Sequence, residues 1–254
     1  MTHATQTPPN NPIDAPGTPE AVWSSWPELD RLPALDVTGW SSAVVIAAHP
    51  DDEVLGPGGI IATLTAVGAK VRLVAVTDGE ASHGQAADPV TLSRRRAAER
   101  LAALHALGAG DVEIIRLGLP DADLAGREDA IASSLAELVT GFDACLAPWE
   151  HDVHADHEAV GRAARHVSHR AAWNAWFYPV WMWHWARPGD PRVPWRRAAR
   201  VPLDPAAAAR KRVAISCFAS QLEPRPGGAA PVLPPAFVPH FLRGYELLFP
   251  MERP

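Results

Sequence analysis

Strand-like and helix-like segments alternate along the middle of this chain. Short apolar runs rich in β-branched residues are typical of buried parallel strands, and they occur at residues 43–48, 71–77, 112–117, 144–147 and 175–178. Segments with a helical pattern lie at residues 58–67, 91–107, 129–140 and 156–172. We therefore predict an α/β fold with a Rossmann-like, mostly parallel sheet and helices on both faces.

The chain divides into a tail, a core and a cap. At 254 residues and 47% hydrophobic composition, it is long enough for one sizeable α/β core. We predict a flexible tail over residues 1–20, because this stretch is rich in Pro, Thr and Asn. A single domain should follow over residues 21–254, with a metal-site core at about 40–180 and a substrate-side cap at about 181–250. The cap is rich in Pro, with one helix predicted at residues 205–221.

Composition argues against several classes of protein. A net charge of −6 gives no basis for binding nucleic acid, and no apolar stretch approaches the roughly 18 residues that a membrane helix needs. The first residues lack the basic-then-apolar order of a secretory signal, so we expect a cytoplasmic protein. Cys145 and Cys217 both lie in apolar runs and are expected to be buried free thiols.

The most informative residues are packed into the stretch His49-Pro-Asp-Asp-Glu53, directly after the first predicted strand. His49 and Asp52 can both turn toward one divalent metal ion as the chain bends into its next helix. Asp51 stands between them as a free carboxylate. A metal-binding pair next to a free carboxylate favours hydrolysis, and the carboxyl end of a strand is where open α/β sheets bind ligands.

A second polar cluster follows the fourth predicted strand. It contains three equally spaced histidines, His151, His154 and His157, with two aspartates among them. Catalytic zinc normally has three protein ligands of His and carboxylate type and an open fourth position, so this cluster is the best source of a third ligand. Both clusters would then meet in one crevice. Spacing alone leaves open which of the histidines takes part.

Together the two clusters resemble the PIG-L/LmbE-type family of zinc-dependent N-deacetylases, which act on N-acetylglucosamine-containing substrates and related amides. The pair of motifs that carries the resemblance is His49-Pro-Asp-Asp-Glu53 with His154-Ala-Asp-His157. Supporting matches extend it over about residues 44–164: Gly56-Pro-Gly-Gly59, Thr77-Asp-Gly-Glu80, Arg96-Ala-Ala-Glu99, Leu107-Gly108 and Leu117-Gly-Leu-Pro-Asp121.

The resemblance implies a role for each matching residue. The resemblance implies that the metal ligands are His49, Asp52 and His157. It makes Asp51 the general base and His154 the group that stabilises the developing oxyanion. It also makes Arg96 and Asp121 contacts of the substrate, although a solvated helix face and a Pro-Asp turn are the plainer interpretations of those two residues.

The chemistry of amide hydrolysis is consistent with these roles. The reaction needs an activated water, a stabilised tetrahedral intermediate and a proton for the departing amine. Asp51 can take the proton of the water and hand it to nitrogen. His154, if protonated, would face the oxyanion, and Asp156 could orient and charge it, or cap the following helix. Glu53 is expected to cap a turn or to bond the second nitrogen of a ligand.

Other polar and aromatic residues have a structural interpretation. His151 is expected at the rim or surface, and His184 in the core or at the rim. Packing or a subunit interface is the favoured role of a tryptophan cluster made of Trp173, Trp176, Trp181, Trp183 and Trp185. The sequence leaves the oligomeric state open and is compatible with a homo-oligomer.

We favour a metal-dependent hydrolase that removes the acetyl group from an N-acetylated amino sugar, free or within a larger glycoconjugate. Alternatives are an amidase of another acylated amine or thiol conjugate, and a non-catalytic sugar- or metal-binding module, against which the intact Asp51 argues. The expected cofactor is Zn²⁺, although iron(II) or another divalent ion also suits such ligands. The expected partner is a small-molecule or glycoconjugate substrate, with no nucleic acid and no membrane span.

Overall fold

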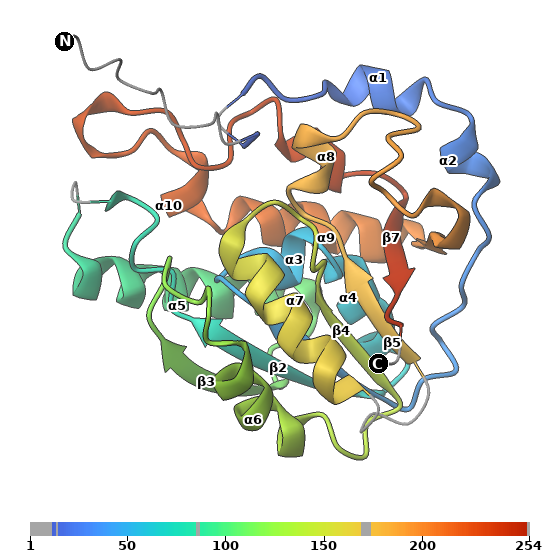
Figure 1. Cartoon of the computed structure of the whole chain (residues 1–254), viewed down its shortest axis with the longest axis horizontal. Coiled ribbons are helices and arrows are strands. Elements are labelled where there is room, and N and C mark those ends of the chain that lie inside the picture. Colours follow the sequence, from blue (N-terminus) through green and yellow to red (C-terminus); the bar gives the residue numbers. More distant parts are fainter. Residues whose placement is uncertain (1–11, 14, 85–86, 169–173, 253–254) are drawn as a thin grey trace, which may run out of the picture.

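The computed structural model describes residues 12–13, 15–84, 87–168 and 174–252. At its centre lies a seven-stranded sheet with the strand order β3-β2-β1-β4-β5-β7-β6 (Figure 1). The strands are β1 (Ser42–Ala47), β2 (Lys70–Thr77), β3 (Glu113–Leu119), β4 (Ala144–Pro148), β5 (Asn174–Tyr178), β6 (Ala199–Pro202) and β7 (Tyr245–Pro250). The predicted α/β class with a mostly parallel sheet is confirmed.

The strands predicted from the apolar runs form the parallel part of the sheet. β1 pairs with β2 on one side and with β4 on the other, so that Ala43 lies opposite both Val71 and Ala144. Both β1 and β4 are buried along nearly their whole length, which explains why they are continuous apolar runs without alternation. From β1 the chain winds toward β2 and β3, and from β4 toward β5. The loops after β1 and β4 therefore diverge and leave a crevice between them.

Two further strands, β6 and β7, lie outside the predicted set and extend one edge of the sheet. β7 runs antiparallel to β5, with Phe249 opposite Phe177, and β6 runs antiparallel to β7. Hydrophobic periodicity does not reveal them because β6 is short and Glu246 interrupts the apolar run of β7. The cap predicted as Pro-rich loop thus contributes to the sheet itself.

Helices cover both faces of the sheet (Figure 1). The longer ones are α4 (Gly58–Ala66), α5 (Pro89–Leu107), α6 (Glu128–Leu138), α7 (Ala155–Val167) and α9 (Pro205–Ser216). The short ones are α1 (Glu20–Ser24), α2 (Glu28–Arg31), α3 (Asp52–Leu55), α8 (Met182–Trp185) and α10 (Ala219–Leu222). α9 packs on α4 and α5, whereas α6 packs on α7. Among the described residues, none of the helices combines the length and the apolar character that crossing a membrane requires.

The helix predicted at residues 205–221 is in fact two helices. α9 ends at Ser216, and Phe218, which is fully buried, has the non-helical angles φ −85° and ψ 56°. Burying this ring bends the chain, and α10 starts in a new direction. Cys217 at the bend is only partly buried, so its prediction as a buried thiol was wrong, whereas Cys145 is buried. Of the helix predicted at 156–172, residues 169–172 lie outside the described residues.

The N-terminal segment contacts the body of the molecule where the structure describes it. Thr18 donates hydrogen bonds to the carbonyl oxygens of His184, at 2.8 Å, and Ala186, at 2.5 Å. Trp23 is buried and donates from Nε1 to the carbonyl oxygen of Trp183 at 2.9 Å. Residues 1–11 and 14 of the predicted tail, and Trp173 of the tryptophan cluster, lie outside the described residues.

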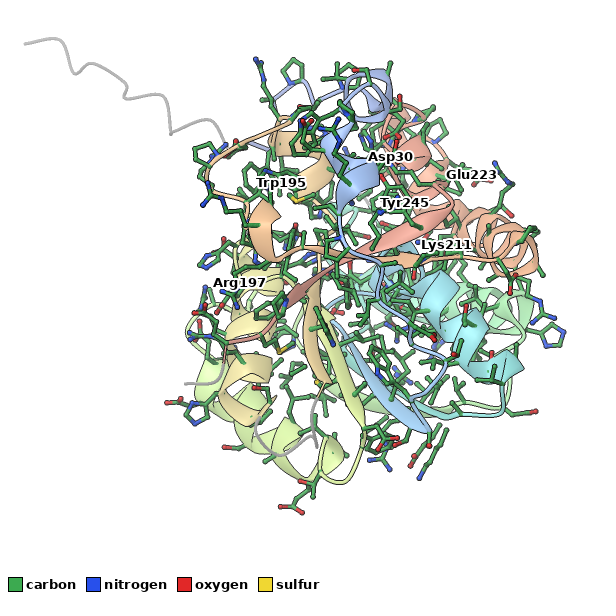
Figure 2. All side chains as sticks on the ribbon, turned by 90° about the vertical axis from the view of Figure 1, so that its right-hand side faces the viewer. Asp30, Trp195, Arg197, Lys211, Glu223 and Tyr245 are labelled. Atoms are coloured by element: carbon green, nitrogen blue, oxygen red, sulfur yellow. The ribbon has the colours of Figure 1, made fainter. Side chains whose placement is uncertain are left out.

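A buried ion pair joins the cap to the core behind the crevice. Lys211 on α9, labelled in Figure 2, lies 2.6 Å from Glu246 on β7, and both side chains are almost fully buried. Glu246 also accepts from the backbone nitrogens of Gly59 and Ile60, at 2.5 and 2.8 Å. Lys211 donates to the carbonyl oxygens of residues 55–56, at 2.8 and 3.1 Å. The pair thus satisfies backbone groups that the ends of α3 and α4 leave free.

Replacing Lys211 by methionine should be strongly destabilising, because Glu246 would remain buried without its cation. We expect the free energy of unfolding to fall by about 3–5 kcal/mol. Urea denaturation measures this change. As a control, Arg31→Met removes one side of the exposed pair with Glu28 and should change stability by less than about 1 kcal/mol. Equal effects of the two substitutions would contradict a structural role for the buried pair.

Candidate metal-binding and catalytic site

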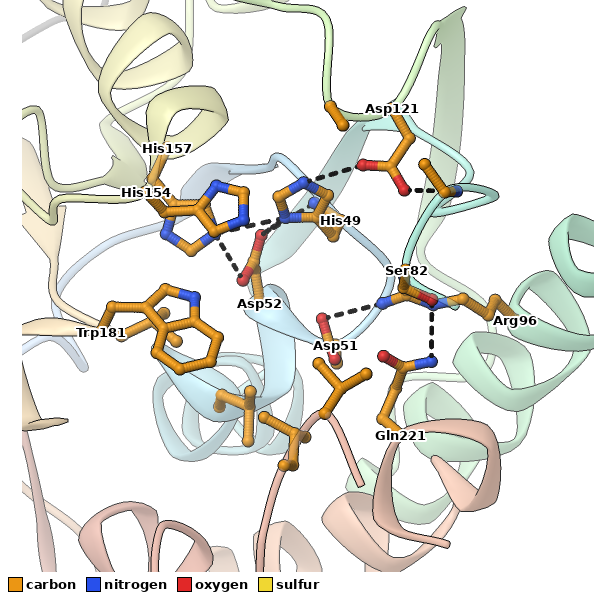
Figure 3. Close-up of a pocket in the computed structure, with 16 residues that line it drawn as sticks. His49, Asp51, Asp52, Ser82, Arg96, Asp121, His154, His157, Trp181 and Gln221 are labelled. Carbon is orange, nitrogen blue, oxygen red and sulfur yellow. Dashed lines mark hydrogen bonds and ion pairs between the residues drawn. The ribbon is translucent and has the colours of Figure 1, made fainter. Parts of the chain in front are cut away.

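The two polar clusters meet in one cavity of about 220 Å³ at the carboxyl ends of β1 and β4 (Figure 3). The predicted site residues that line it are His49, Asp51, Asp52, Arg96, Asp121, His154 and His157. Asp156, the remaining predicted site residue, contacts His49 from outside the lining. Further lining residues, which the sequence does not mark as a group, are Ser82, Trp181, Gln221, Val232 and Leu233.

Three predicted metal ligands direct their donor atoms at one another. His49 Nδ1 and His157 Nε2 are 3.3 Å apart, and oxygens of the Asp52 carboxylate lie 3.4 and 3.2 Å from these two nitrogens. In a tetrahedral site with bonds of about 2.0–2.1 Å, neighbouring ligand atoms lie about 3.3–3.4 Å apart. The three side chains therefore have the spacing of three corners of such a site. A ring nitrogen of His154 also lies within 4.8 Å of ring nitrogens of His49 and His157.

Each of these two histidines has a carboxylate at its other ring nitrogen. His157 Nδ1 lies 2.8 Å from Asp152 Oδ2, and His49 Nε2 lies 3.1 Å from Asp156 and 3.2 Å from Asp121. Because a carboxylate accepts hydrogen bonds, these contacts favour a proton on His49 Nε2 and on His157 Nδ1 when the rings are neutral. A metal ion at the common point would then be held by His49 Nδ1 and His157 Nε2.

The surrounding carboxylates also set the charge of the site. Burial lowers the pKa of His157, yet Asp52 and Asp152 outweigh it and raise that pKa to about 9. For His49 burial is likewise outweighed by its carboxylate partners, and the pKa lies well above its usual value. Both shifts mean that this point of the cavity stabilises positive charge.

Asp51 offers a carboxylate to the same cavity beside Arg96, at 3.3 Å. Burial raises the pKa of Asp51 to about 7, although the guanidinium of Arg96 opposes the shift. Arg96 is itself 2% exposed and donates to the carbonyl oxygens of Gly79 and Pro50, at 2.9 and 2.7 Å. A β-carbon on Gly79 would lie 2.1 Å from Arg96 Nη1, so only glycine allows this approach. A carboxyl group with a pKa near 7 suits proton transfer.

The loops around the cavity hold strained backbone. Asp51, Ala122 and Val153, with φ values of 143°, 61° and 70°, are the residues other than glycine with positive φ in the described part of the chain. Such conformations cost on the order of 1–3 kcal/mol each and persist only where surrounding contacts fix them. At Asp51 the fixing contact comes from Glu53, which accepts from its backbone nitrogen at 3.2 Å and pairs with Arg100 at 3.1 Å.

His154 and Asp156 differ from the prediction. Asp156 was expected to charge His154 or to cap α7, but its partners are His49 and the backbone nitrogens of Ala122 and Leu124, at 2.8 and 3.1 Å. The N-cap of α7 is His154. Burial, reinforced by the two neighbouring histidines, lowers the pKa of His154 to about 3, and its Nδ1 lacks a partner within the described residues. Burial thus disfavours the imidazolium form of His154, and the described hydrogen bonds of Asp156 go to other groups.

Asp121 lies on the cavity wall as predicted, but protein groups already contact its carboxylate. It accepts from the backbone nitrogen of Ala81 at 2.8 Å and lies 3.2 Å from His49 Nε2. Burial raises the pKa of Asp121, but His49 outweighs this effect and lowers the pKa to about 2. The side chain is therefore an anionic acceptor at the wall.

Two important residues are not recognisable from the sequence. Asp152 is fully buried and accepts from the backbone nitrogens of Trp181 and Met182, both at 2.8 Å, as well as from His157. Only its place among the histidines points to the site. Gln221 reaches the cavity because the chain bends between α9 and α10, a bend that the helical pattern does not reveal.

Several solved structures have a similar fold. A conserved protein of Thermus thermophilus is similar in structure, with a TM-score of 0.53 and 28% identity over 70% of this chain and 79% of that chain. The N,N'-diacetylchitobiose deacetylase of Pyrococcus horikoshii has a TM-score of 0.56 and is 20% identical, over 80% of this chain and 79% of that chain. The A40926 pseudoaglycone deacetylase has a TM-score of 0.60 and is 21% identical, over 84% of this chain and 98% of that chain.

Sequence comparison adds a family. Among curated protein sequences none matches this chain. Residues 44–168 match the family model described as PIG-L: GlcNAc-PI de-N-acetylase, and this stretch contains both polar clusters and the strands that position them. Residues 44–168 are thus similar to the PIG-L family.

Proposed function

We propose that this chain is a metal-dependent N-deacetylase, a hydrolase that removes the acetyl group from an N-acetylated amino sugar of the N-acetylglucosamine type. The observation that carries the proposal is the convergence of His49, Asp52 and His157 at tetrahedral spacing beside the carboxylate of Asp51. The family model described as a GlcNAc-PI de-N-acetylase and the solved structures titled as deacetylases support the same reaction.

In this proposal His49, Asp52 and His157 hold one divalent metal ion. Two imidazole nitrogens and a carboxylate suit Zn²⁺, and also iron(II). When bound, such an ion lowers the pKa of water toward roughly 7 and polarises a carbonyl group. Asp152 and Asp156 would keep the two imidazole rings in the orientation of ligands.

Asp51 would act as the general base. In this proposal Asp52 binds the metal ion and Asp51 does not, so the carboxylate of Asp51 can accept and donate protons. It would accept a proton from the attacking water and pass it to the nitrogen of the departing amine, so one residue serves both halves of the reaction. Arg96, at 3.3 Å, would hold the carboxylate in the direction of the cavity.

His154 would stabilise the oxyanion as a neutral hydrogen-bond donor. A neutral imidazole still carries one N–H group. The Nδ1 of His154 is buried without a partner in the described part of the protein, so a developing negative charge in the cavity would find a donor that nothing else occupies. This role replaces the charged one that the sequence suggested.

The cavity wall suits a sugar better than a purely apolar amide. Trp181 stacks on Phe237 at 4.9 Å and on His154 at 6.3 Å, with interplanar angles of 18° and 20°. Its ring is thereby fixed next to the site, and Trp181 contributes aromatic surface to the lining of the cavity. Asp121 offers an anionic acceptor for hydroxyl groups on the opposing wall.

The metal set can be tested by composition and by substitution. We expect about one divalent ion per chain and loss of deacetylation after treatment with a chelator. His157→Ala should lower metal occupancy strongly, whereas His151→Ala, at an exposed position, should leave it unchanged. Elemental analysis of the purified variants measures both. A metal-free preparation with full activity would overturn the mechanism.

Asp51→Asn should remove the base while keeping size and metal. We expect kcat to fall by about 10²–10⁴-fold, toward the upper end because the residue is proposed to move the proton twice. Turnover of an N-acetylglucosaminide and metal content are measured on the same preparation. Near-normal turnover at full metal occupancy would assign the base to another residue.

Arg96 distinguishes two roles, positioning of Asp51 and contact with the substrate. Because its guanidinium is buried against Asp51 and two carbonyl groups, Arg96→Met should lower kcat at nearly unchanged KM. We expect a loss of about 1.5–3 kcal/mol of transition-state stabilisation. Steady-state kinetics, with a melting curve to verify folding, decides between the roles. A raised KM at unchanged kcat would instead indicate that Arg96 contacts the substrate.

A further inference from the structure

Six buried polar side-chain atoms have no hydrogen-bond partner among the described residues, and three of these belong to residues that line the cavity. The three are His154 Nδ1, Arg96 Nε and Gln221 Oε1. An unpaired buried group is unfavourable, and a ligand that supplies the missing partner recovers this free energy. His154 and Arg96 already have a place in the proposed reaction. Gln221 has none.

Gln221 is held rigidly on α10. Its side chain is fully buried, its backbone nitrogen donates to the carbonyl oxygen of Phe218, and its own carbonyl oxygen accepts from Leu233, both at 2.9 Å. The side-chain Nε2 donates to Ser220 Oγ at 2.9 Å and lies 3.4 Å from Ser82 Oγ. The carboxamide is therefore fixed in place, on the side of Asp51 away from the histidines (Figure 3).

The neighbours of Gln221 determine which end of its carboxamide is free. Ser220 Oγ donates its only proton to Glu99 at 2.5 Å, and Glu99 also accepts from the backbone nitrogen of Ser220 at 2.8 Å. Since its proton is committed, Ser220 Oγ can only accept from Gln221. The NH₂ group of Gln221 must face Ser220, and the oxygen must be the end without a partner.

A hydrogen-bond donor brought by a ligand would supply the missing partner of Gln221 Oε1. Hydroxyl, ammonium and amide N–H groups can all donate to such an oxygen. On the amino sugar of the proposed function, the donors apart from the acetamide are ring hydroxyl groups. A hydroxyl group is therefore the partner that this substrate offers.

We propose that Gln221 is a specificity-determining residue that accepts a hydrogen bond from a ring hydroxyl group of the substrate. The inference rests on the proposed deacetylase function and deepens it, since it selects N-acetylated sugars with a free hydroxyl at one ring position over acylated amines without one. The fixed carboxamide is formed before the substrate arrives, so little conformational freedom is lost on binding.

The test combines changes on the substrate with changes on the protein. The parent probe is methyl N-acetyl-β-glucosaminide, and the comparison probes are its deoxy analogues, each of which lacks one hydroxyl group. For the metal-loaded native chain, kcat/KM should fall about 10- to 100-fold for one analogue, because Gln221 Oε1 then stays unpaired. In Gln221→Met, which keeps the length of the side chain but has no strong acceptor, the parent and that analogue should react at similar rates.

A second variant guards against a folding defect. Gln221→Asn keeps the carboxamide but withdraws it by one methylene group, so it too should lose the preference. Circular dichroism and melting temperature verify that each variant is folded. If every analogue loses as much activity in the folded variants as in the native chain, the role of Gln221 is overturned while the deacetylase function stands. If no N-acetylated amino sugar is hydrolysed at all, the proposed function fails and this inference fails with it.

Discussion

Five acidic side chains are buried where β1 and β4 end, and the site is built around the need to give each one a partner. They are Asp51, Asp52, Glu53, Asp152 and Asp156, none more than 5% exposed. A buried carboxylate is very unfavourable unless cations or hydrogen-bond donors surround it. Arginine, histidine and backbone nitrogens fill this requirement, and in doing so they fix the loops that carry the strained backbone. Electrostatic pairing therefore helps to determine the positions of the side chains in the site, in addition to apolar packing.

Helix α5 supplies the fixed cations. Arg96 and Arg100 are four residues apart on it, so both project from one face toward the turn after β1. Arg96 pairs with Asp51 and Arg100 with Glu53, at 3.3 and 3.1 Å. The permanently charged groups beside the cavity thus come from α5, whereas its histidines come from the turn after β1 and from the first residues of α7 and its N-cap. The plainer interpretation of Arg96 as part of a solvated face is wrong, because its side chain is buried.

The parallel strands and the meeting of the two polar clusters could be predicted because both depend on local signals. Apolar runs mark buried strands, and neighbouring strand ends meet at one edge of a parallel sheet. Predictions failed where a partner comes from a distant segment. Asp156 is one example, because its alternatives near in sequence were His154 and a helix cap, while the actual contacts with Ala122 and Leu124 arise only when the loop after β3 folds over α7. The bend at Phe218 is another example. A buried aromatic residue fits the hydrophobic pattern of a helix whether it lies inside the helix or in a bend between two helices.

Asp152 has a consequence for how the two halves of the cavity respond to each other. One carboxylate anchors both the imidazole of His157 and the backbone of the segment that carries Trp181. The imidazole of His157 and the backbone at Trp181 therefore share one acceptor group, so a shift of this carboxylate changes the hydrogen bonds of both. Two binding events that share an anchor are thermodynamically linked, and the linkage is reciprocal. The proposed affinities for an ion and for a sugar would then depend on each other through Asp152.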